Sequence, residues 1–202
     1  MFIQVIQGRV SEPEEIARAF DEWHRELAPD AVGWIGTTAG VTADGELVAV
    51  VRFESAEAAQ RNSNRPEQHR WWTETAKLLA GEVVFHDCPT VDTFLAGGSD
   101  DAGFVQVIQG TVSDADRMRE LMGQMSGLND YRPEIIGGTV ALDNDGAHFT
   151  QVVYFTSERE ARQGESKEPP PELRDTMAES DQLIHDTRFF DLTEPWLYAP
   201  GE

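Results

Sequence analysis

Cysteine, long apolar runs and basic leader segments are scarce or missing. Cys88 is the single cysteine among 202 residues, so no disulfide can form within the chain. No apolar run reaches the roughly 18 residues that a membrane-spanning helix needs. The first residues show no basic stretch followed by an apolar one, so we expect no secretory signal. These features predict a cytoplasmic protein with no membrane attachment.

Positive charge is also scarce. The chain has 16 Lys and Arg against 37 Asp and Glu, which gives a net charge of -21. So acidic a surface repels nucleic-acid phosphates and anionic lipids, so we expect no nucleic-acid partner. The charge suits a solvating surface, with a cationic partner as the alternative.

Signatures of metal and nucleotide binding are missing. The sequence contains no HExxH and no CxxC, and its five histidines lie far apart. Gly97-Gly98 does not open a helix after a strand, so it does not form a phosphate-binding loop. We therefore predict no metal and no cofactor. Cys88, within a strand pattern, is interpreted as an inert residue rather than a nucleophile.

A repeated strand is the most informative feature present. Residues 2–11 are FIQVIQGRVS and residues 104–113 are FVQVIQGTVS, with eight of ten positions identical. The alternation of side chains predicts a β-strand. Both of its faces are largely apolar, which indicates a sheet covered on both sides.

Each copy continues with the same order of elements, βαββαβ. In the first copy we predict strands over 2–10, 32–41, 47–53 and 83–88, a helix after Ser11 and a helical region over 56–79 that Pro66 breaks. In the second copy we predict strands over 104–112, 135–142, 149–155 and 183–192, with helices after Ser113 and Ser157. Asp44-Gly45 and Asp145-Gly146 predict tight hairpins. Ser11, Ser55, Ser113 and Ser157 are the expected helix caps.

The βαββαβ order is the ferredoxin-like pattern. One such unit would leave an apolar sheet face exposed, and a second copy can cover it. We therefore predict an α+β fold of two tandem ferredoxin-like repeats packed as an intramolecular dimeric α/β-barrel, or pseudo-dimer. The expected limits are repeat 1 over 1–95, a linker over 96–103, repeat 2 over 104–197 and a tail over 198–202. The chain would be a monomer with this internal pairing, or a homodimer.

Three segments of the first repeat carry a family resemblance: NSNRPEQHRWW at 62–72, FHDC at 85–88 and VDTF at 91–94. They resemble the dimeric α/β-barrel superfamily, and within it antibiotic-biosynthesis-monooxygenase-like (ABM-like) proteins with two tandem repeats, of actinobacterial type. The resemblance implies a cofactor-independent, monooxygenase-like enzyme or a binder of a small hydrophobic aromatic molecule. The same fold hosts haem-degrading enzymes, but His69 precedes the tryptophan pair here, so the haem role is not transferred. The alternative is a non-catalytic binding or assembly protein without an active site.

Six residues of the first repeat are candidates for binding such a ligand: Gln4, Gln7, Asn62, His69, Trp71 and Trp72. Aromatic, amide and imidazole groups can stack on a ligand or stabilise its anion by hydrogen bonds. The tryptophans could instead fill core around a kink at Pro66, and the glutamines could pair across the sheet. No catalytic residue is identified.

A comparison of the two copies predicts that a ligand site lies in the first repeat. A gapless overlay of 55–95 on 157–197 places Trp71 on Leu173 and Trp72 on Arg174, so the second copy lacks these aromatic groups. His86-Asp87 and His185-Asp186 each end a copy. Neighbouring residues on a strand point to opposite faces, which argues against a catalytic pair at either position.

Overall fold

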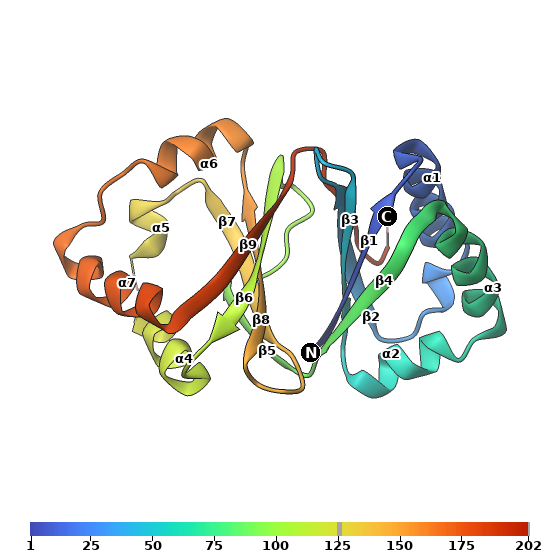
Figure 1. The fold of residues 1–202 in the computed structure, drawn as a ribbon, viewed down its shortest axis with the longest axis horizontal. Helices are drawn as coiled ribbons and strands as arrows, with labels where there is room; N and C mark the ends of the chain where they lie inside the picture. The colour runs from blue at the N-terminus through green and yellow to red at the C-terminus, as the bar shows by residue number, and fades with distance from the viewer. Residues whose placement is uncertain (125–126, 202) are drawn as a thin grey trace. The chain divides into compact units, whose positions relative to one another are not determined.

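The computed structural model of the protein describes residues 1–124 and 127–201. The described chain forms two compact units: Met1–Thr90 together with the segment from Glu194, and Val91–Thr193. Each unit is a five-stranded sheet whose helices lie on one face (Figure 1). The fold class is α+β with two ferredoxin-like repeats, as predicted.

The first unit has the sheet order β10-β2-β3-β1-β4. Its strands are β1 (Phe2–Val10), β2 (Trp34–Val41), β3 (Glu46–Phe53), β4 (Leu79–Cys88) and β10 (Trp196–Tyr198). Its helices are α1 (Pro13–Glu26), α2 (Ala56–Ser63) and α3 (Pro66–Thr75), with short 3-10 turns η1 (Ala28–Asp30) and η2 (Ala76–Leu78).

The second unit has the equivalent order β5-β7-β8-β6-β9. Its strands are β5 (Thr90–Leu95), β6 (Phe104–Val112), β7 (Ile135–Leu142), β8 (His148–Phe155) and β9 (Ile184–Leu192). Its helices are α4 (Ala115–Gln124), α5 (Leu128–Tyr131), α6 (Glu158–Glu165) and α7 (Pro171–Leu183).

The two compact units do not contain the same segments as the predicted repeats, 1–95 and 104–197. Strand β5 follows β4 along the chain but joins the sheet of the second unit beside β7, and β10 joins the sheet of the first unit beside β2. Without these strands, β2 and β7 would each end their sheet with unpaired backbone groups. The sequence repeat predicts where the copies begin, but it does not show that their last strands are exchanged.

The two hairpin turns form as predicted. Gly45 and Gly146 adopt φ values of +83° and +69°, which glycine tolerates because it has no Cβ. The helix caps agree only in part. Ser55 and Ser157 accept hydrogen bonds from the N–H groups of Ala58 and Glu160.

The other two predicted caps are wrong. The Ser11 hydroxyl donates to the carbonyl of Leu78, and the Ser113 hydroxyl donates to that of Leu183. These two bonds tie the residue that follows β1 or β6 to the residue that precedes β4 or β9. Asp114 caps α4 instead, because its side chain accepts from the N–H of Arg117.

Among the described residues, the helix-facing core forms one buried cluster in the first unit and two in the second. In the first unit seventeen buried residues form one cluster, which includes Phe20, Trp23 and Trp34. In the second unit the helix-facing residues form two smaller clusters, one around Phe104 and one around Phe149.

Candidate ligand-binding site

Trp71 and Trp72, predicted to line a pocket, lie within an aromatic cluster of the first unit. The rings of Trp71 and Phe20 are packed edge-on, with 5.7 Å between their centroids. The Nε1–H of Trp71 donates a hydrogen bond of 2.9 Å to the carbonyl oxygen of Ala19. Trp72 meets Phe85 edge-on at 5.4 Å. Both tryptophans are half-buried and pack against the first unit's core. Their described contacts join α3 to α1 and to the sheet.

Asn62 is buried and serves the loop between α2 and α3. Its Oδ1 accepts from Nη1 of Arg65 at 3.0 Å, and the same Nη1 donates to the carbonyl of Leu27. Arg65 also pairs with Glu67. Asn62 therefore helps to hold the side chain that links the α2–α3 loop to the end of α1.

The remaining three candidates are not brought together with these residues. His69 is exposed on α3. Gln4 donates to Oδ1 of Asp87 on the neighbouring strand at 2.8 Å. Gln7 is buried and, by strand alternation, points to the sheet face away from the helices. A ligand site formed by the six residues stays a prediction.

The structural equivalence of the copies departs from the gapless overlay. Leu79 opens β4 opposite Val10, and Ile184 opens β9 opposite Val112. The second copy thus has three extra residues before this point, in the proline-rich α6–α7 loop. Trp72 consequently corresponds to Met177 rather than to Arg174. His86 and His185 are not equivalent either, because they pair with Val5 and Thr111.

The same sheet positions are less exposed in the first unit, where Phe85 is 46% exposed, than in the second. Ile6 faces Phe85 across β1 and β4, and Ile108 faces Phe189 across β6 and β9. Ile6 is 7% exposed, whereas Ile108 is only partly buried and borders both small clusters. Phe189 is 61% exposed.

Two positions that pack on the helix side of the sheet carry smaller side chains in the second unit. Ile135 occupies the position of Trp34, since each pairs with the phenylalanine that ends its neighbouring strand. Met177 occupies the position of Trp72. The first unit thus carries large aromatic rings at these two positions, and the second unit carries smaller aliphatic side chains.

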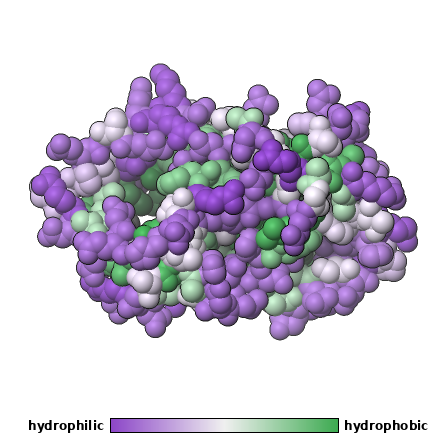
Figure 2. All heavy atoms as spheres, in the orientation of Figure 1, coloured by the Kyte–Doolittle hydropathy of each residue, from purple (hydrophilic) through white to green (hydrophobic). Residues whose placement is uncertain are grey.

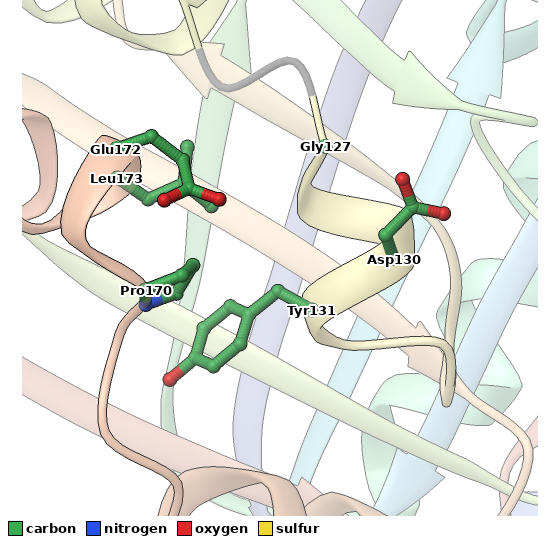
Figure 3. Close-up of a pocket in the computed structure, with 6 residues that line it drawn as sticks. All are labelled: Gly127, Asp130, Tyr131, Pro170, Glu172 and Leu173. Atoms are coloured by element: carbon green, nitrogen blue, oxygen red, sulfur yellow. The ribbon is translucent and has the colours of Figure 1, made fainter.

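A pocket of about 250 Å³ lies among the helices of the second unit. Figure 3 shows its lining, which α5 and the start of α7 supply: Gly127, Asp130, Tyr131, Pro170, Glu172 and Leu173. Figure 2 shows a hollow with hydrophobic residues in it, which lies between α5 and strands β7 and β9 in the orientation of Figure 1. A concave, partly apolar space of this kind is where a small ligand is expected.

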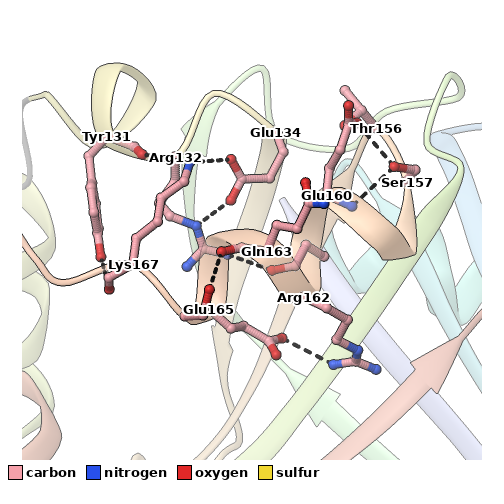
Figure 4. Close-up of polar contacts among 12 residues, drawn as sticks. Tyr131, Arg132, Glu134, Thr156, Ser157, Glu160, Arg162, Gln163, Glu165 and Lys167 are labelled. Carbon is pink, nitrogen blue, oxygen red and sulfur yellow. Dashed lines mark hydrogen bonds and ion pairs between the residues drawn. The ribbon is translucent and has the colours of Figure 1, made fainter.

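The Tyr131 wall of the pocket is held from behind by polar contacts (Figure 4). The Tyr131 hydroxyl donates to the carbonyl of Lys167 at 2.8 Å. The Lys167 ammonium lies 3.7 Å from the carboxylate of Glu134, which also pairs with Arg132. This network connects α5 to the loop after α6.

Glu134 is buried beside α6, and its charge is balanced. Burial raises its pKa, but the hydrogen bond from Arg132, one from the backbone, and the positive charges of Arg132 and Lys167 together lower it further, so its pKa is lowered overall. A Cβ at Gly164 would lie 1.8 Å from Glu134 Oε1. Glycine is therefore required there, where the first copy has Asn62.

Gln4 and Gln106, at equivalent positions of the two copies, each donate a hydrogen bond to an aspartate. Gln106 donates to Oδ1 of Asp191 at 2.9 Å, and this bond repeats the Gln4–Asp87 bond of the first unit. In the second unit Arg162 also pairs with Asp191 and lies 5.2 Å from the centre of the Phe104 ring. These bonds connect β6, β9 and α6, and the matching bond in the first unit agrees with a structural role for Gln4.

In the described part of the chain no three His, Cys, Asp or Glu side chains are placed to hold a metal ion. Within residues 1–124 and 127–201 no helix has the length and apolar character to cross a membrane.

Two ferredoxin-like repeats in one chain define the structural class of the protein. Comparisons with known proteins show which solved structures share this fold. No family model and no curated protein matches the sequence. A "putative monooxygenase" from Lactobacillus acidophilus NCFM has a TM-score of 0.77 at 11% identity, covering 99% of this chain and 96% of that chain. A second "putative monooxygenase", from Fusobacterium nucleatum subsp. nucleatum, has a TM-score of 0.78 at 10% identity, covering 99% and 94%.

A further similar structure is a "major regulator of staphylococcal pathogenesis", with a TM-score of 0.56 at 7% identity, covering 98% of this chain and 99% of that chain. The protein thus has a monooxygenase-like ferredoxin fold. Identities this low establish the fold and leave the activity to be argued from the site.

Proposed function

We propose that the protein binds a small, neutral, hydrophobic aromatic molecule in the second repeat, between its helices and its sheet. The observation that carries the proposal is the contrast between Ile6 and Ile108. Ile6 is buried in the core cluster of the first unit, whereas Ile108 is only partly buried in the second unit, which has a pocket lined by α5 and the start of α7. A duplicated unit needs both copies for its fold but only one for binding.

The lining groups favour a flat apolar ligand. Tyr131 offers a ring held by Lys167, Leu173 offers aliphatic surface, and Phe189 is an exposed ring on the adjoining sheet. Aromatic rings stack favourably on such surfaces. The volume of about 250 Å³ is below the usual range for drug-sized ligands, so the ligand should be small.

Charge favours a neutral ligand. Asp130 and Glu172 line the pocket, and the whole chain carries -21. Carboxylates disfavour a bound anion. Cofactor-free oxygenation proceeds through the anion of an electron-rich aromatic substrate, which this lining would not stabilise. Binding is therefore proposed ahead of turnover.

We also infer that the chain is an ABM-like protein with two tandem repeats. Support comes from the segments at 62–72, 85–88 and 91–94 and from the ferredoxin fold shared with the two monooxygenase-like structures. The alternative, a non-catalytic assembly protein, predicts that no aromatic ligand binds.

Calorimetry with neutral two- and three-ring aromatic phenols and ketones tests the proposal. Ile108→Phe should fill the open space and abolish binding at little cost in stability. The matched change Ile6→Phe overpacks a filled core, so it should lower stability by about 1–3 kcal/mol while binding is retained. Binding that survives Ile108→Phe, or no binding by any compound, would overturn the proposal.

An oxygen electrode adds a second measurement with the same compounds. We expect ligands to bind without oxygen uptake above the rate of free solution. Oxygen uptake that Ile108→Phe abolishes would replace the binding function with an oxygenase at the same pocket.

A further inference from the structure

Glu172 is the second residue of α7, and its counterpart in the first copy is Glu67 of α3. Pro66 opens α3 and Pro171 opens α7, and each proline lies the same number of residues before β4 or β9. A carboxylate therefore follows the helix-opening proline in both copies. The two carboxylates differ in what surrounds them.

Glu67 has a basic partner within the first unit. Arg65 stands directly before Pro66, and its Nε donates to Oε1 of Glu67 at 2.9 Å. The same arginine also donates from Nη1 to the carbonyl of Leu27. The carboxylate of Glu67 thus belongs to a network that connects the start of α3 to the end of α1.

This basic partner is missing beside Glu172. The loop before α7 is longer than the loop before α3, and Pro170 takes the place directly before Pro171. Lys167, the basic residue of the longer loop, lies 3.7 Å from Glu134 instead. Within residues 1–124 and 127–201, no side chain forms an ion pair or a hydrogen bond with the Glu172 carboxylate.

The Glu172 side chain lines the pocket of about 250 Å³. Figure 3 shows its carboxylate on the side of α7 that faces α5. Leu173, the next residue, adds apolar surface to the pocket where the first copy has Gln68, whose Oε1 accepts from Nε1 of Trp23 at 2.6 Å. The polar groups at the start of α3 are therefore used inside the first unit, whereas Glu172 borders an open space.

The side chains around this pocket can accept hydrogen bonds but have no donor to spare. The hydroxyl of Tyr131 already donates to the carbonyl of Lys167 at 2.8 Å. Asp130 and Glu172 are carboxylates, which only accept when ionised. The other lining residues have no polar side chain. A ketone or ether oxygen would find no side-chain donor here, so the polar group of a ligand should itself be a donor.

We propose that Glu172 selects aromatic ligands that carry an O–H or N–H group, by accepting a hydrogen bond from that group. The inference rests on the proposed binding of an aromatic molecule in this pocket, and it names the chemical class of that molecule. A hydrogen bond to a carboxylate is about twice as strong as one between neutral groups. It would give Glu172 the donor that Arg65 gives Glu67, and it would fix the orientation of the ring.

Calorimetry with two matched pairs of two-ring compounds tests the inference: indole with N-methylindole, and 2-naphthol with 2-methoxynaphthalene. Within each pair only the first compound can donate, and the added methyl group supplies more apolar surface. Near neutral pH we expect each donor to bind at least about tenfold more tightly than its methylated partner. The pair with the larger ratio shows whether N–H or O–H is recognised better.

Three variants locate the preference. Glu172→Leu removes the acceptor and should bring the ratio of affinities in each pair to about one or below. Glu172→Gln keeps an acceptor oxygen without the charge and should give a ratio between those of Glu172→Leu and the native chain. The control Glu67→Gln removes an equal charge from the equivalent position of the first copy and should keep the native ratio. Because Glu172 is exposed, we expect its variants to fold, which circular dichroism checks.

Equal affinities within both pairs would reject the inference and leave the proposed aromatic site in place. A donor preference that persists unchanged in Glu172→Leu would reject it as well. If Glu172→Leu does not fold, an unchanged ratio in Glu172→Gln is enough for rejection. If the native chain binds none of the four compounds, the proposed function fails together with the inference.

Discussion

The hydroxyl of Tyr198 donates a hydrogen bond to Oδ1 of Asp21 at 2.8 Å. This bond joins β10, the last strand of the chain, to α1, the first helix. The Tyr198 ring also lies 5.0 Å from the ring of His24, and burial, followed by the Asp21 carboxylate, raises the pKa of Tyr198. The C-terminal segment therefore stabilises the first unit through side chains as well as through backbone pairing.

Tyr198→Phe should lower the free energy of unfolding by about 1 kcal/mol, because it removes one hydrogen bond and keeps the ring. Urea unfolding followed by tryptophan fluorescence measures the loss in the right place, since all five tryptophans belong to the first unit. Asp21→Asn keeps an acceptor and should cost less than Tyr198→Phe. An unchanged midpoint in Tyr198→Phe would show that the bond contributes nothing.

The pair Asp145–His148 predicts a pH-dependent hairpin. Backbone N–H groups of His148 and Ala147, then the His148 side chain, lower the pKa of Asp145 to about 2. The hydrogen bond to Asp145 raises the pKa of His148 above its usual 6.5. Ionised Asp145 therefore stabilises the folded state. This stabilisation is fully present above pH 3.8, the usual pKa of Asp, and is lost as pH falls towards 2. Protonated His148 also stabilises the folded state. This stabilisation is fully present below pH 6.5 and is lost as pH rises through the raised pKa of His148.

The contact should therefore be strongest between about pH 4 and 6.5. An NMR titration of the His148 ring measures it. In Asp145→Asn the pKa of His148 should fall relative to the native chain. The same pKa in both proteins would mean that the carboxylate does not act on the imidazole.

Net charge predicts a salt effect on the whole chain. A charge of -21 repels itself, and ions screen this repulsion over about 10 Å at 0.1 M. Tm should therefore rise between low salt and roughly 0.3 M NaCl. The described ion pairs oppose this trend, but acids outnumber bases by more than two to one, so repulsion should dominate. A flat or falling Tm would indicate that ion pairs dominate.

The repeated strand was enough to predict the fold class, but local chemistry was harder to predict. The identity of Gln4 and Gln106 indicated a shared role, yet their partners Asp87 and Asp191 could not be matched. Extra residues before α7 shift the later elements, and the gapless overlay sets Asp87 against Phe189. Register within a sheet depends on hydrogen bonds that a linear comparison does not contain.

The pocket was harder still to predict, because it depends on missing volume rather than on a motif. Its lining residues, such as Asp130, Tyr131 and Leu173, belong to no motif that the sequence would reveal. The sequence drew attention to the aromatic-rich first copy. There the aromatic side chains contact each other, and Trp71 already donates to a backbone carbonyl.

Gly138 and Phe94 give a last prediction, on the second exchanged strand. Phe94 of β5 lies directly over Gly138 of β7, so that a Cβ at 138 would lie 2.0 Å from Cζ of the ring. Gly138→Ala should force the ring and β5 away from the sheet and lower stability by about 1–3 kcal/mol. The control Gly123→Ala adds the same methyl group where, apart from its chain neighbours and its own helix backbone, no described atom lies within 4 Å. It lies within α4, so it should be neutral or stabilising by up to about 1 kcal/mol.

Phe94→Leu removes the clashing edge of the ring and should recover part of the loss. The double variant Phe94→Leu with Gly138→Ala should therefore be more stable than the sum of the single changes predicts, by about 1 kcal/mol or more. Urea unfolding followed by circular dichroism measures all four proteins, because the second unit contains no tryptophan. Additive effects would mean that β5 does not hold Phe94 against Gly138 in solution, and that the exchanged strand contributes little to the second sheet.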